Sequence, residues 1–230
     1  KVIECCANSI TSALIGIKAG ANRIELCADL QNGGVTPKYS EIKKLRDLTS
    51  IDLHVLILPI ANKFSYSKKD LKKIVSDIEF CKKIGVEGVV VGAINKDKSI
   101  DITTTTKMVD LARPMKVTFH RAFDKCSDLQ NNLEDIIKTG CDYLLTSGQC
   151  SDVNEGLKNI AQLIKMAKNR VTILAGGGVN HNNISKLYEV GVRQFHLSGS
   201  STNKFGETET NFNLIQQAVK AINEINEKSN

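Results

Sequence analysis

Val117-Thr118-Phe119-His120-Arg121-Ala122-Phe123-Asp124 is a stretch in which a buried strand runs directly into charged residues. From Lys116 to His120 the side chains alternate between two faces, which is the pattern of a β-strand. A guanidinium and a carboxylate follow within the next four residues. Parallel sheets bind ligands at the carboxyl ends of their strands, so His120, Arg121 and Asp124 are candidate site residues. The alternative is a core strand followed by a solvated loop.

The same succession of an apolar strand and a helical pattern occurs eight times in the 230 residues. Gly20, Gly85, Gly140 and Gly191 each end a helical pattern shortly before the next strand, as C-capping glycines do. Eight strand–helix units with short loops predict a TIM barrel, a single α/β domain over residues 1–230. An open doubly wound sheet is the alternative, but no Gly-x-Gly-x-x-Gly follows the first strand.

The periodicity also predicts where the elements begin and end. Strands are expected at residues 2–6, 23–27, 53–58, 86–92, 116–120, 142–146, 170–175 and 193–198. Helices are expected from a cap at Asn8 or Ser9 to Gly20, from residues 32–34 to 48, from a Ser67/Asp70 capping box to 84, before 112, and at 129–138, 153–167, 182–189 and 212–226. Residues 223–230 are expected to form a polar, frayed tail.

Composition excludes several classes of protein. The net charge is only +6, aromatic residues make up 5% and Trp is absent, which argues against nucleic-acid binding. No apolar run reaches the roughly 18 residues that a membrane span needs, and residues 1–4 are too polar for a signal peptide. The seven cysteines are odd in number and contain no Cys-x-x-Cys pair, which indicates free thiols in a reducing cytoplasm.

Strand parity separates the side chains that face the helices from those that face the barrel interior. Alternate strand residues are apolar and should meet the helices: Ile3, Ile24, Leu26, Val55, Ile57, Val117, Phe119, Phe195 and Leu197. The inward set is unusually polar: Glu4, Cys6, Arg23, Glu25, Cys27, His54, Thr118, His120, Thr146, His196 and Ser198. Buried charges must be paired, so we expect an ion-pair network of Glu4, Arg23 and Glu25. Such a network either only fixes the strand register or supports a ligand site.

Two cysteines, Cys6 and Cys27, have the same parity at the carboxyl ends of the first two strands. Neighbouring strands lie about 4.8 Å apart, so the two thiols could share one soft metal ion, Cu(I) or Zn(II). Cys5 points to the opposite face. The alternative is that the thiols are small buried apolar groups. That interpretation is the one adopted for Cys81, Cys126, Cys141 and Cys150.

Two glycine-containing loops suggest an anion site. Ala175-Gly176-Gly177-Gly178-Val179 follows the seventh strand, and Ser198-Gly199-Ser200-Ser201 follows the eighth. Loops at these two positions hold phosphate in many TIM barrels, through backbone N–H groups. Gly176, Gly177, Gly178, Gly199 and Ser200 are therefore candidate anion-binding residues. The alternative is that tight turns alone require the glycines.

The sequence resembles the CutC family, known as copper homeostasis proteins, almost from end to end. The resemblance rests on Glu4-Cys5-Cys6, Arg23-Ile24-Glu25-Leu26-Cys27, Gly33-Gly34-Val35-Thr36-Pro37, Phe119-His120-Arg121-Ala122-Phe123-Asp124, Leu145-Thr146-Ser147-Gly148 and Ala175-Gly176-Gly177-Gly178-Val179. It implies a TIM barrel, a cytoplasmic location, and a homodimer or higher homo-oligomer. It also implies a role in copper binding and trafficking, with Cys6 and Cys27 as ligands of Cu(I). One departure is that Leu58-Pro59-Ile60 stands where the family has Arg-Pro-Arg.

Two functions remain open from the sequence. One is copper homeostasis through Cu(I) bound by Cys6 and Cys27. The other is an enzyme that acts on a small anionic, possibly phosphorylated metabolite at the carboxyl-end face of the barrel. In that enzyme Glu4 or Glu25 would be the acid or base, and His120 a proton donor or polariser. Arg121 with the glycine loops would bind the anion, beside Asp124. So many titratable groups exceed what a two-thiol metal site needs.

Overall fold

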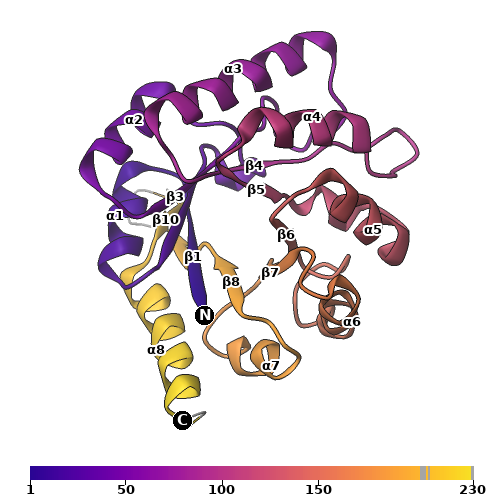
Figure 1. The fold of residues 1–230 in the computed structure, drawn as a ribbon. Helices are drawn as coiled ribbons and strands as arrows, with labels where there is room; N and C mark the ends of the chain where they lie inside the picture. Colours follow the sequence, from indigo (N-terminus) through magenta and orange to yellow (C-terminus); the bar gives the residue numbers. More distant parts are fainter. Residues whose placement is uncertain (203–205, 207, 229–230) are drawn as a thin grey trace.

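Eight parallel strands close into a barrel in the order β1 to β8, and the helices lie around it (Figure 1). The structure is a computed structural model that describes residues 1–202, 206 and 208–228. The strands are β1 Val2–Ala7, β2 Arg23–Leu26, β3 Asp52–Leu56, β4 Gly88–Val91, β5 Lys116–Phe119, β6 Tyr143–Thr146, β7 Thr172–Gly176 and β8 Gln194–Leu197. The helices are α1 Ile10–Lys18, α2 Tyr39–Leu48, α3 Lys68–Ile84, α4 Ile102–Ala112, α5 Leu129–Thr139, α6 Leu157–Ala167, α7 Ile184–Glu189 and α8 Phe212–Lys228. The predicted TIM barrel is confirmed.

Local sequence signals define most of the helix ends. Ser9 caps α1, its hydroxyl accepting a hydrogen bond from the Ser12 backbone N–H. Ser67 and Asp70 form the predicted capping box at the start of α3. Gly85 ends α3 in the left-handed conformation, with φ at +75°. Each cap satisfies backbone groups that the helix alone leaves unpaired.

Some predicted boundaries were wrong, and the backbone gives the reason. The helix expected from residues 32–34 begins only at Tyr39, because Gly33 and Gly34 adopt φ values of +104° and +83° that no helix contains. The helix expected at 153–167 begins at Leu157, since the backbone N–H of Val153 is bonded to the Gly177 carbonyl.

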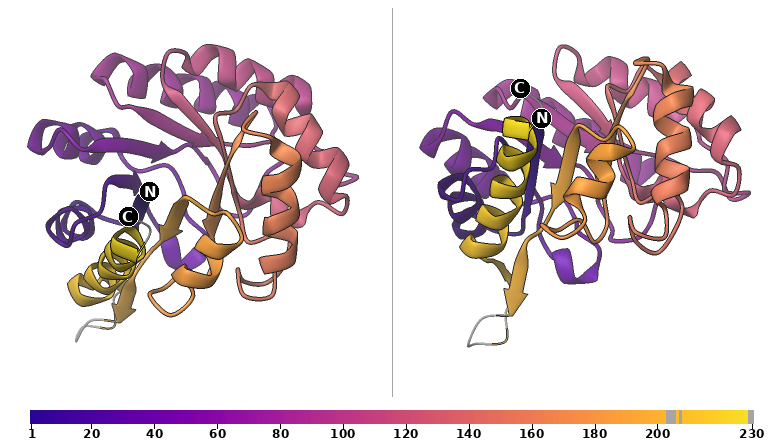
Figure 2. Two further views of the ribbon diagram at one scale, coloured as in Figure 1. Left: turned by 60° about the horizontal axis from the view of Figure 1, so that its bottom comes forward. Right: turned by 90° about the horizontal axis from the view of Figure 1, so that it is seen from below.

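The last helix is longer than predicted, and an unpredicted hairpin precedes it. α8 continues to Lys228, so residues 223–228, expected as a polar tail, are helical. Ile222 is buried and Ile225 packs against the core, which keeps this part of the helix on the barrel. β9 (Ser200–Thr202) and β10 (Thr208–Thr210) pair antiparallel and project away from the barrel wall (Figure 2). Residues 229–230 lie outside the described part of the chain.

The register of the barrel places the polar parity inside. β1 lies between β2 and β8, with Glu4 opposite Arg23 on one side and His196 on the other. The opposite parity packs between the strands and the helices, as predicted for Ile3, Cys5, Leu26 and Phe119. The strand register therefore agrees with the parity derived from the sequence.

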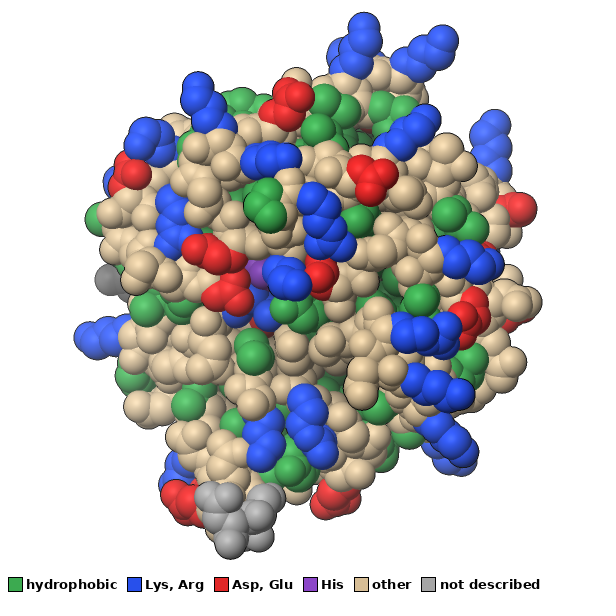
Figure 3. Space-filling model, viewed as in Figure 1, with side chains coloured by type: hydrophobic (Ala, Val, Ile, Leu, Met, Phe, Trp, Pro, Cys, Tyr) green, Lys and Arg blue, Asp and Glu red, His purple; other side chains and the backbone are tan. Residues whose placement is uncertain are grey.

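The outer surface mixes charges of both signs. On the face in Figure 3, Lys and Arg side chains are scattered among Asp and Glu, and acidic, basic and histidine side chains meet near its centre. In the described residues no helix has both the length and the apolar character needed to cross a membrane.

Candidate functional site

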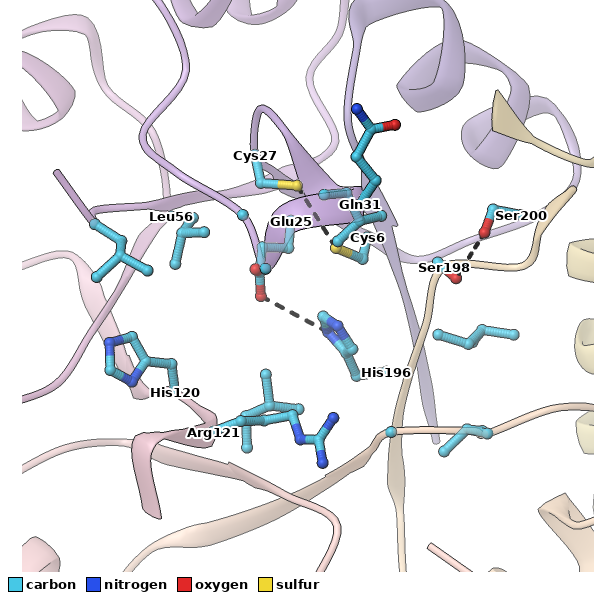
Figure 4. A pocket seen from close by; sticks show the side chains of 18 of the residues that line it. Cys6, Glu25, Cys27, Gln31, Leu56, His120, Arg121, His196, Ser198 and Ser200 are labelled. Carbon is cyan, nitrogen blue, oxygen red and sulfur yellow. Dashed lines mark hydrogen bonds and ion pairs between the residues drawn. The ribbon is translucent and has the colours of Figure 1, made fainter. Parts of the chain in front are cut away.

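A cavity of about 490 Å³ opens at the carboxyl ends of the barrel strands (Figure 4). Cys6, Glu25, Cys27, His120, Arg121 and His196 are its charged, imidazole and thiol side chains. Apolar side chains and short loops complete the wall: Leu30, Gly33, Gly34, Leu56, Leu58, Phe64, Leu145, Gly177, Gly178, Val179 and Leu197, with Gln31, Ser198, Ser200 and Thr208. The predicted thiols and most of the predicted catalytic side chains thus share one cavity.

The two thiols lie side by side in one wall. The sulfur atoms of Cys6 and Cys27 are 3.8 Å apart, and the residues are 5% and 1% exposed. Leu56, Leu58 and Val90 pack around them as an apolar cluster. The contact with Cys27, together with burial, raises the pKa of the Cys6 thiol well above its ordinary value. The Cys6 thiol is therefore neutral until a ligand displaces its proton.

Glu4 lies beneath the cavity and is fully engaged by neighbours. Its Oε2 accepts a hydrogen bond from Arg23, and its Oε1 lies 2.6 Å from Nδ1 of His196. Burial would raise the pKa of Glu4, but the Arg23 guanidinium and the His196 imidazole hold it well below the ordinary value. Because Glu4 is fully buried and does not line the cavity, it supports the site but cannot reach a substrate.

Glu25 is the carboxylate that reaches the cavity. Its Oε2 is buried, lies 3.7 Å from Nδ1 of His196 and makes no hydrogen bond within the described residues. Burial, with a contribution from Glu4, raises the pKa of Glu25 to about 7, although His196 opposes the rise. The carboxyl therefore exchanges its proton near neutral pH, as a general acid or base must.

A second possible metal-binding group lies beside the thiols. The candidate ligand atoms of Glu4, Glu25 and His196 all lie within 4.8 Å of one another. The predicted network of Glu4, Arg23 and Glu25 forms only in part. Arg23 forms an ion pair with Glu4, whereas Glu25 lies beside His196. The guanidinium of Arg23 next to Glu4 opposes the binding of a further cation there.

His120 stands at the edge of the cavity as a neutral imidazole. Its Nδ1 accepts a hydrogen bond of 3.3 Å from the Ala122 backbone N–H, so the proton belongs on Nε2. Burial lowers the pKa of His120 to about 4. The ring packs 4.9 Å from the Phe64 ring, and a β-carbon at Gly92 would lie 2.7 Å from it. His120 is thus a fixed hydrogen-bond donor rather than a cation at neutral pH.

Arg121 is held in place by Asp124. Nε of Arg121 donates to Asp124 at 2.7 Å, and Nη2 donates to the Ser147 hydroxyl at 2.8 Å. The Asp124 carboxylate also accepts bonds from the Thr146 and Ser147 hydroxyls and from the backbone N–H groups of Ser147 and Gln149. The hydrogen bonds occupy both Asp124 oxygens, and Asp124 holds the Arg121 guanidinium in place.

The Asp124→Asn substitution is expected to lower the free energy of unfolding by about 2 kcal/mol, because an amide NH₂ would face the N–H and O–H donors that surround the carboxylate. Chemical denaturation would measure the loss. Asp135→Asn is the matched control, since Asp135 only pairs with Lys138 at the surface and should cost less than about 0.5 kcal/mol. Equal losses in the two variants would contradict the positioning role.

The two glycine loops contribute unequally. Gly177 and Gly178 line the cavity, and a β-carbon at Gly177 would lie 2.8 Å from Cζ of Arg121. Ser200 also lines it. Gly176 and Gly199 are not among the lining residues, and a β-carbon at Gly199 would instead meet Ile215 of α8. The loops therefore meet at the cavity through Gly177, Gly178 and Ser200.

Comparison with known proteins assigns the family. The CutC family model matches residues 1–201. The chain belongs to the CutC family. A CutC family protein from Parabacteroides distasonis is 45% identical over 203 residues, which cover 87% of this chain and 84% of that protein. One from Pasteurella multocida is 42% identical over 198 residues, covering 86% and 81%.

Solved structures agree with the CutC assignment. The crystal structure of a CutC protein from Streptococcus agalactiae, for which copper homeostasis is a proposed role, has a TM-score of 0.81 and 28% identity. It covers 86% of this chain, and the match covers 98% of that chain. Thiamine phosphate pyrophosphorylase from Pyrococcus furiosus shares only the fold, with a TM-score of 0.64 and 14% identity over 98% and 96% of the two chains.

Within this CutC fold, the departure from the family pattern has a clear structural effect. Leu58 is buried in the cavity wall beside the thiols, whereas Ile60 is 48% exposed. Lys63, the nearest cation in the following loop, pairs with Asp70 at 2.7 Å. The cavity wall formed after β3 is therefore apolar, and Arg121 carries the positive charge at the opposite wall.

Sequence reasoning assigned no role to two residues that contact the charged side chains of the site. His196 was expected inside the barrel, and its position opposite Glu4 on the neighbouring strand is the signal that could have joined it to the network. Ser147 lies in one of the family motifs, but nothing in its sequence position indicates that its hydroxyl supports Arg121.

Proposed function

We propose that this CutC family member binds Cu(I) in the cytoplasm, through the thiolates of Cys6 and Cys27, and serves copper homeostasis by holding or passing on the ion. The observation that carries the proposal is the pair of thiol sulfurs 3.8 Å apart in the wall of the cavity. The family resemblance and the proposed role of the Streptococcus agalactiae protein support it.

The separation of the sulfurs suits a shared ion. Two sulfurs bound at about 2.3 Å to one ion, at the tetrahedral angle, lie about 3.8 Å apart. The thiols of Cys6 and Cys27 already have this spacing, so the strands need not move. Thiolates are soft ligands that favour Cu(I), and Glu25 and His196 line the same cavity as further groups that could complete the coordination.

Titration of the reduced protein with Cu(I), against a competing chelator, should reveal one tight site. Cys6→Ser and Cys27→Ser should each weaken it at least tenfold, about 1.4 kcal/mol, because one thiolate remains. Cys81→Ser is the matched control, since Cys81 is buried in the layer between strands and helices. The same affinity in the wild type and both cavity variants would refute the site, and tighter binding of Zn(II) than of Cu(I) would refute the choice of ion.

One observation favours a second candidate function, an enzyme that acts on a small anionic metabolite. Copper binding does not explain why Glu25 keeps a buried oxygen without a hydrogen bond in the described residues, at a pKa of about 7. In such an enzyme Glu25 would move the proton, His120 would donate a hydrogen bond from Nε2, and Arg121 would bind the anionic group. This candidate requires that the cavity bind an anion, whatever its affinity for copper.

A further inference from the structure

We propose that the cavity is a binding site for a small hydroxylated oxyanion, a carboxylate or phosphate compound whose anionic group is held by Arg121 and whose hydroxyl meets Glu25. The inference does not rest on copper binding, because neither Arg121 nor its supporting residues contact the thiols. It supplies the substrate class for the second candidate function.

The first argument is how Arg121 is presented. Asp124 and Ser147 fix Nε and Nη2 from one side, while 40% of the side chain is exposed. A guanidinium has five N–H groups, and these two bonds are its polar contacts within the described residues. Three donors therefore remain for a ligand. A guanidinium that is both immobilised and left with free donors suits an oxyanion, which accepts two parallel hydrogen bonds from it.

The second argument is the space kept beside Arg121. Gly177 has φ at +100°, and a β-carbon there would lie 2.8 to 3.0 Å from the guanidinium carbon and nitrogens. Any other residue would therefore displace the guanidinium. The glycine allows the loop after β7 to run directly against Arg121, and Gly178 continues it along the cavity wall.

The third argument is a buried carboxylate oxygen without a hydrogen bond, on another wall of the cavity. Glu25 is 4% exposed, and Figure 4 shows its carboxylate directed toward the space between His196 and Arg121. Its Oε2 makes no hydrogen bond within the described residues. Its contact with Nδ1 of His196, at 3.7 Å, is too long for a hydrogen bond, and a buried acceptor without one is costly, so a ligand hydroxyl would satisfy it.

The apolar lining residues and the volume of the cavity limit the kind of ligand that fits. Leu56, Leu58, Phe64 and Leu145 also line the cavity, so a carbon chain attached to the anionic group would contact apolar side chains. A volume of about 490 Å³ is enough for a metabolite of a few carbon atoms.

Isothermal titration calorimetry with three probes, inorganic phosphate, glycerol phosphate and glycerate, tests the site at constant ionic strength. All measurements use copper-free, reduced protein. We expect saturable binding of inorganic phosphate, and tighter binding of glycerol phosphate because its hydroxyls reach Glu25. Glycerate tells whether a carboxylate replaces the phosphate. Arg121→Gln should weaken each bound probe at least tenfold, and Ser147→Ala should weaken it less, since the charge remains. Circular dichroism establishes that each variant is folded.

Two controls separate this inference from copper binding. Arg170→Gln removes an exposed arginine that pairs with Glu134, and it should leave the affinity unchanged. Arg121→Gln should in turn keep the Cu(I) affinity of the wild type, because Arg121 does not contact the thiols, so failure of one site can be told from failure of the other. The proposal would be overturned if none of the three probes showed saturable binding, or if the wild type and Arg121→Gln bound them with equal affinity. Glycerol phosphate binding no tighter than inorganic phosphate would overturn the contact with Glu25.

Discussion

Replacing Arg23 by Met is expected to lower the free energy of unfolding by about 3–5 kcal/mol, which makes it the most damaging single change in the barrel interior. Arg23 and Glu4 are 2% and 0% exposed, and their ion pair joins β2 to β1. Arg23 also donates to the Gln194 side chain at 2.8 Å and lies 4.8 Å from the centre of the Tyr143 ring. Methionine keeps the apolar stem but leaves the Glu4 carboxylate without its guanidinium.

The double substitution Glu4→Gln with Arg23→Met separates the ion pair from packing. Removing both charges leaves no unpaired charge at position 4, so the double variant should regain a large part of the stability. Arg170→Met is the surface control, because its partner Glu134 is 41% exposed and the pair should contribute less than about 1 kcal/mol. Urea denaturation measures all three variants with the wild type. A double variant as unstable as Arg23→Met would mean that packing, not charge, dominates.

The parity of the strand residues was enough to predict the interior of the barrel. Because strand side chains alternate strictly, knowing that Ile3 and Cys5 face the helices fixes Glu4 and Cys6 on the other side. Neighbouring strands then bring Cys6 and Cys27 together, and the sulfur contact of 3.8 Å agrees with this expectation. The barrel and the location of the site at the carboxyl ends of the strands follow from the same periodic pattern.

The roles within the site could not be derived in this way. Glu4 and Glu25 have the same parity, yet one is locked by Arg23 and the other faces the cavity. The difference depends on side-chain rotamers and on His196, which lies at the other end of the chain and lodges between the two carboxylates. Asp124 likewise resembled a catalytic carboxylate in sequence, and only its five donors, several from residues 146–149, identify it as a support for Arg121.

Glu25→Gln is expected to stabilise the protein above pH 7 by up to about 3 kcal/mol and to have little effect near pH 5. The folded pKa of Glu25 is about 7, above its ordinary value of 4.5, so the folded state holds more protons than the unfolded state between these values. The stability that the protonated Glu25 carboxyl contributes to the folded state is therefore present at low pH and is lost as the pH rises through 7. A rise of that size corresponds to about 3 kcal/mol, and glutamine removes the buried charge altogether.

Two histidines determine the pH window in which this effect can be measured. The folded pKa of His120 is about 4, so its protonation destabilises the protein only as the pH falls below about 6.5. Burial lowers the pKa of His196, but the carboxylates of Glu25 and Glu4 raise it by more, so it lies above the ordinary value. The stability that protonated His196 contributes is therefore lost as the pH rises, like that from Glu25. Urea denaturation between pH 6.5 and 8 captures the last part of this loss, so the wild type should lose about 1 kcal/mol over the window while Glu25→Gln shows a flatter profile. Glu79→Gln, on the exposed face of α3, is the matched control and should follow the wild type. Parallel profiles for the wild type and Glu25→Gln would mean that the Glu25 carboxyl is not held in its protonated form by the barrel.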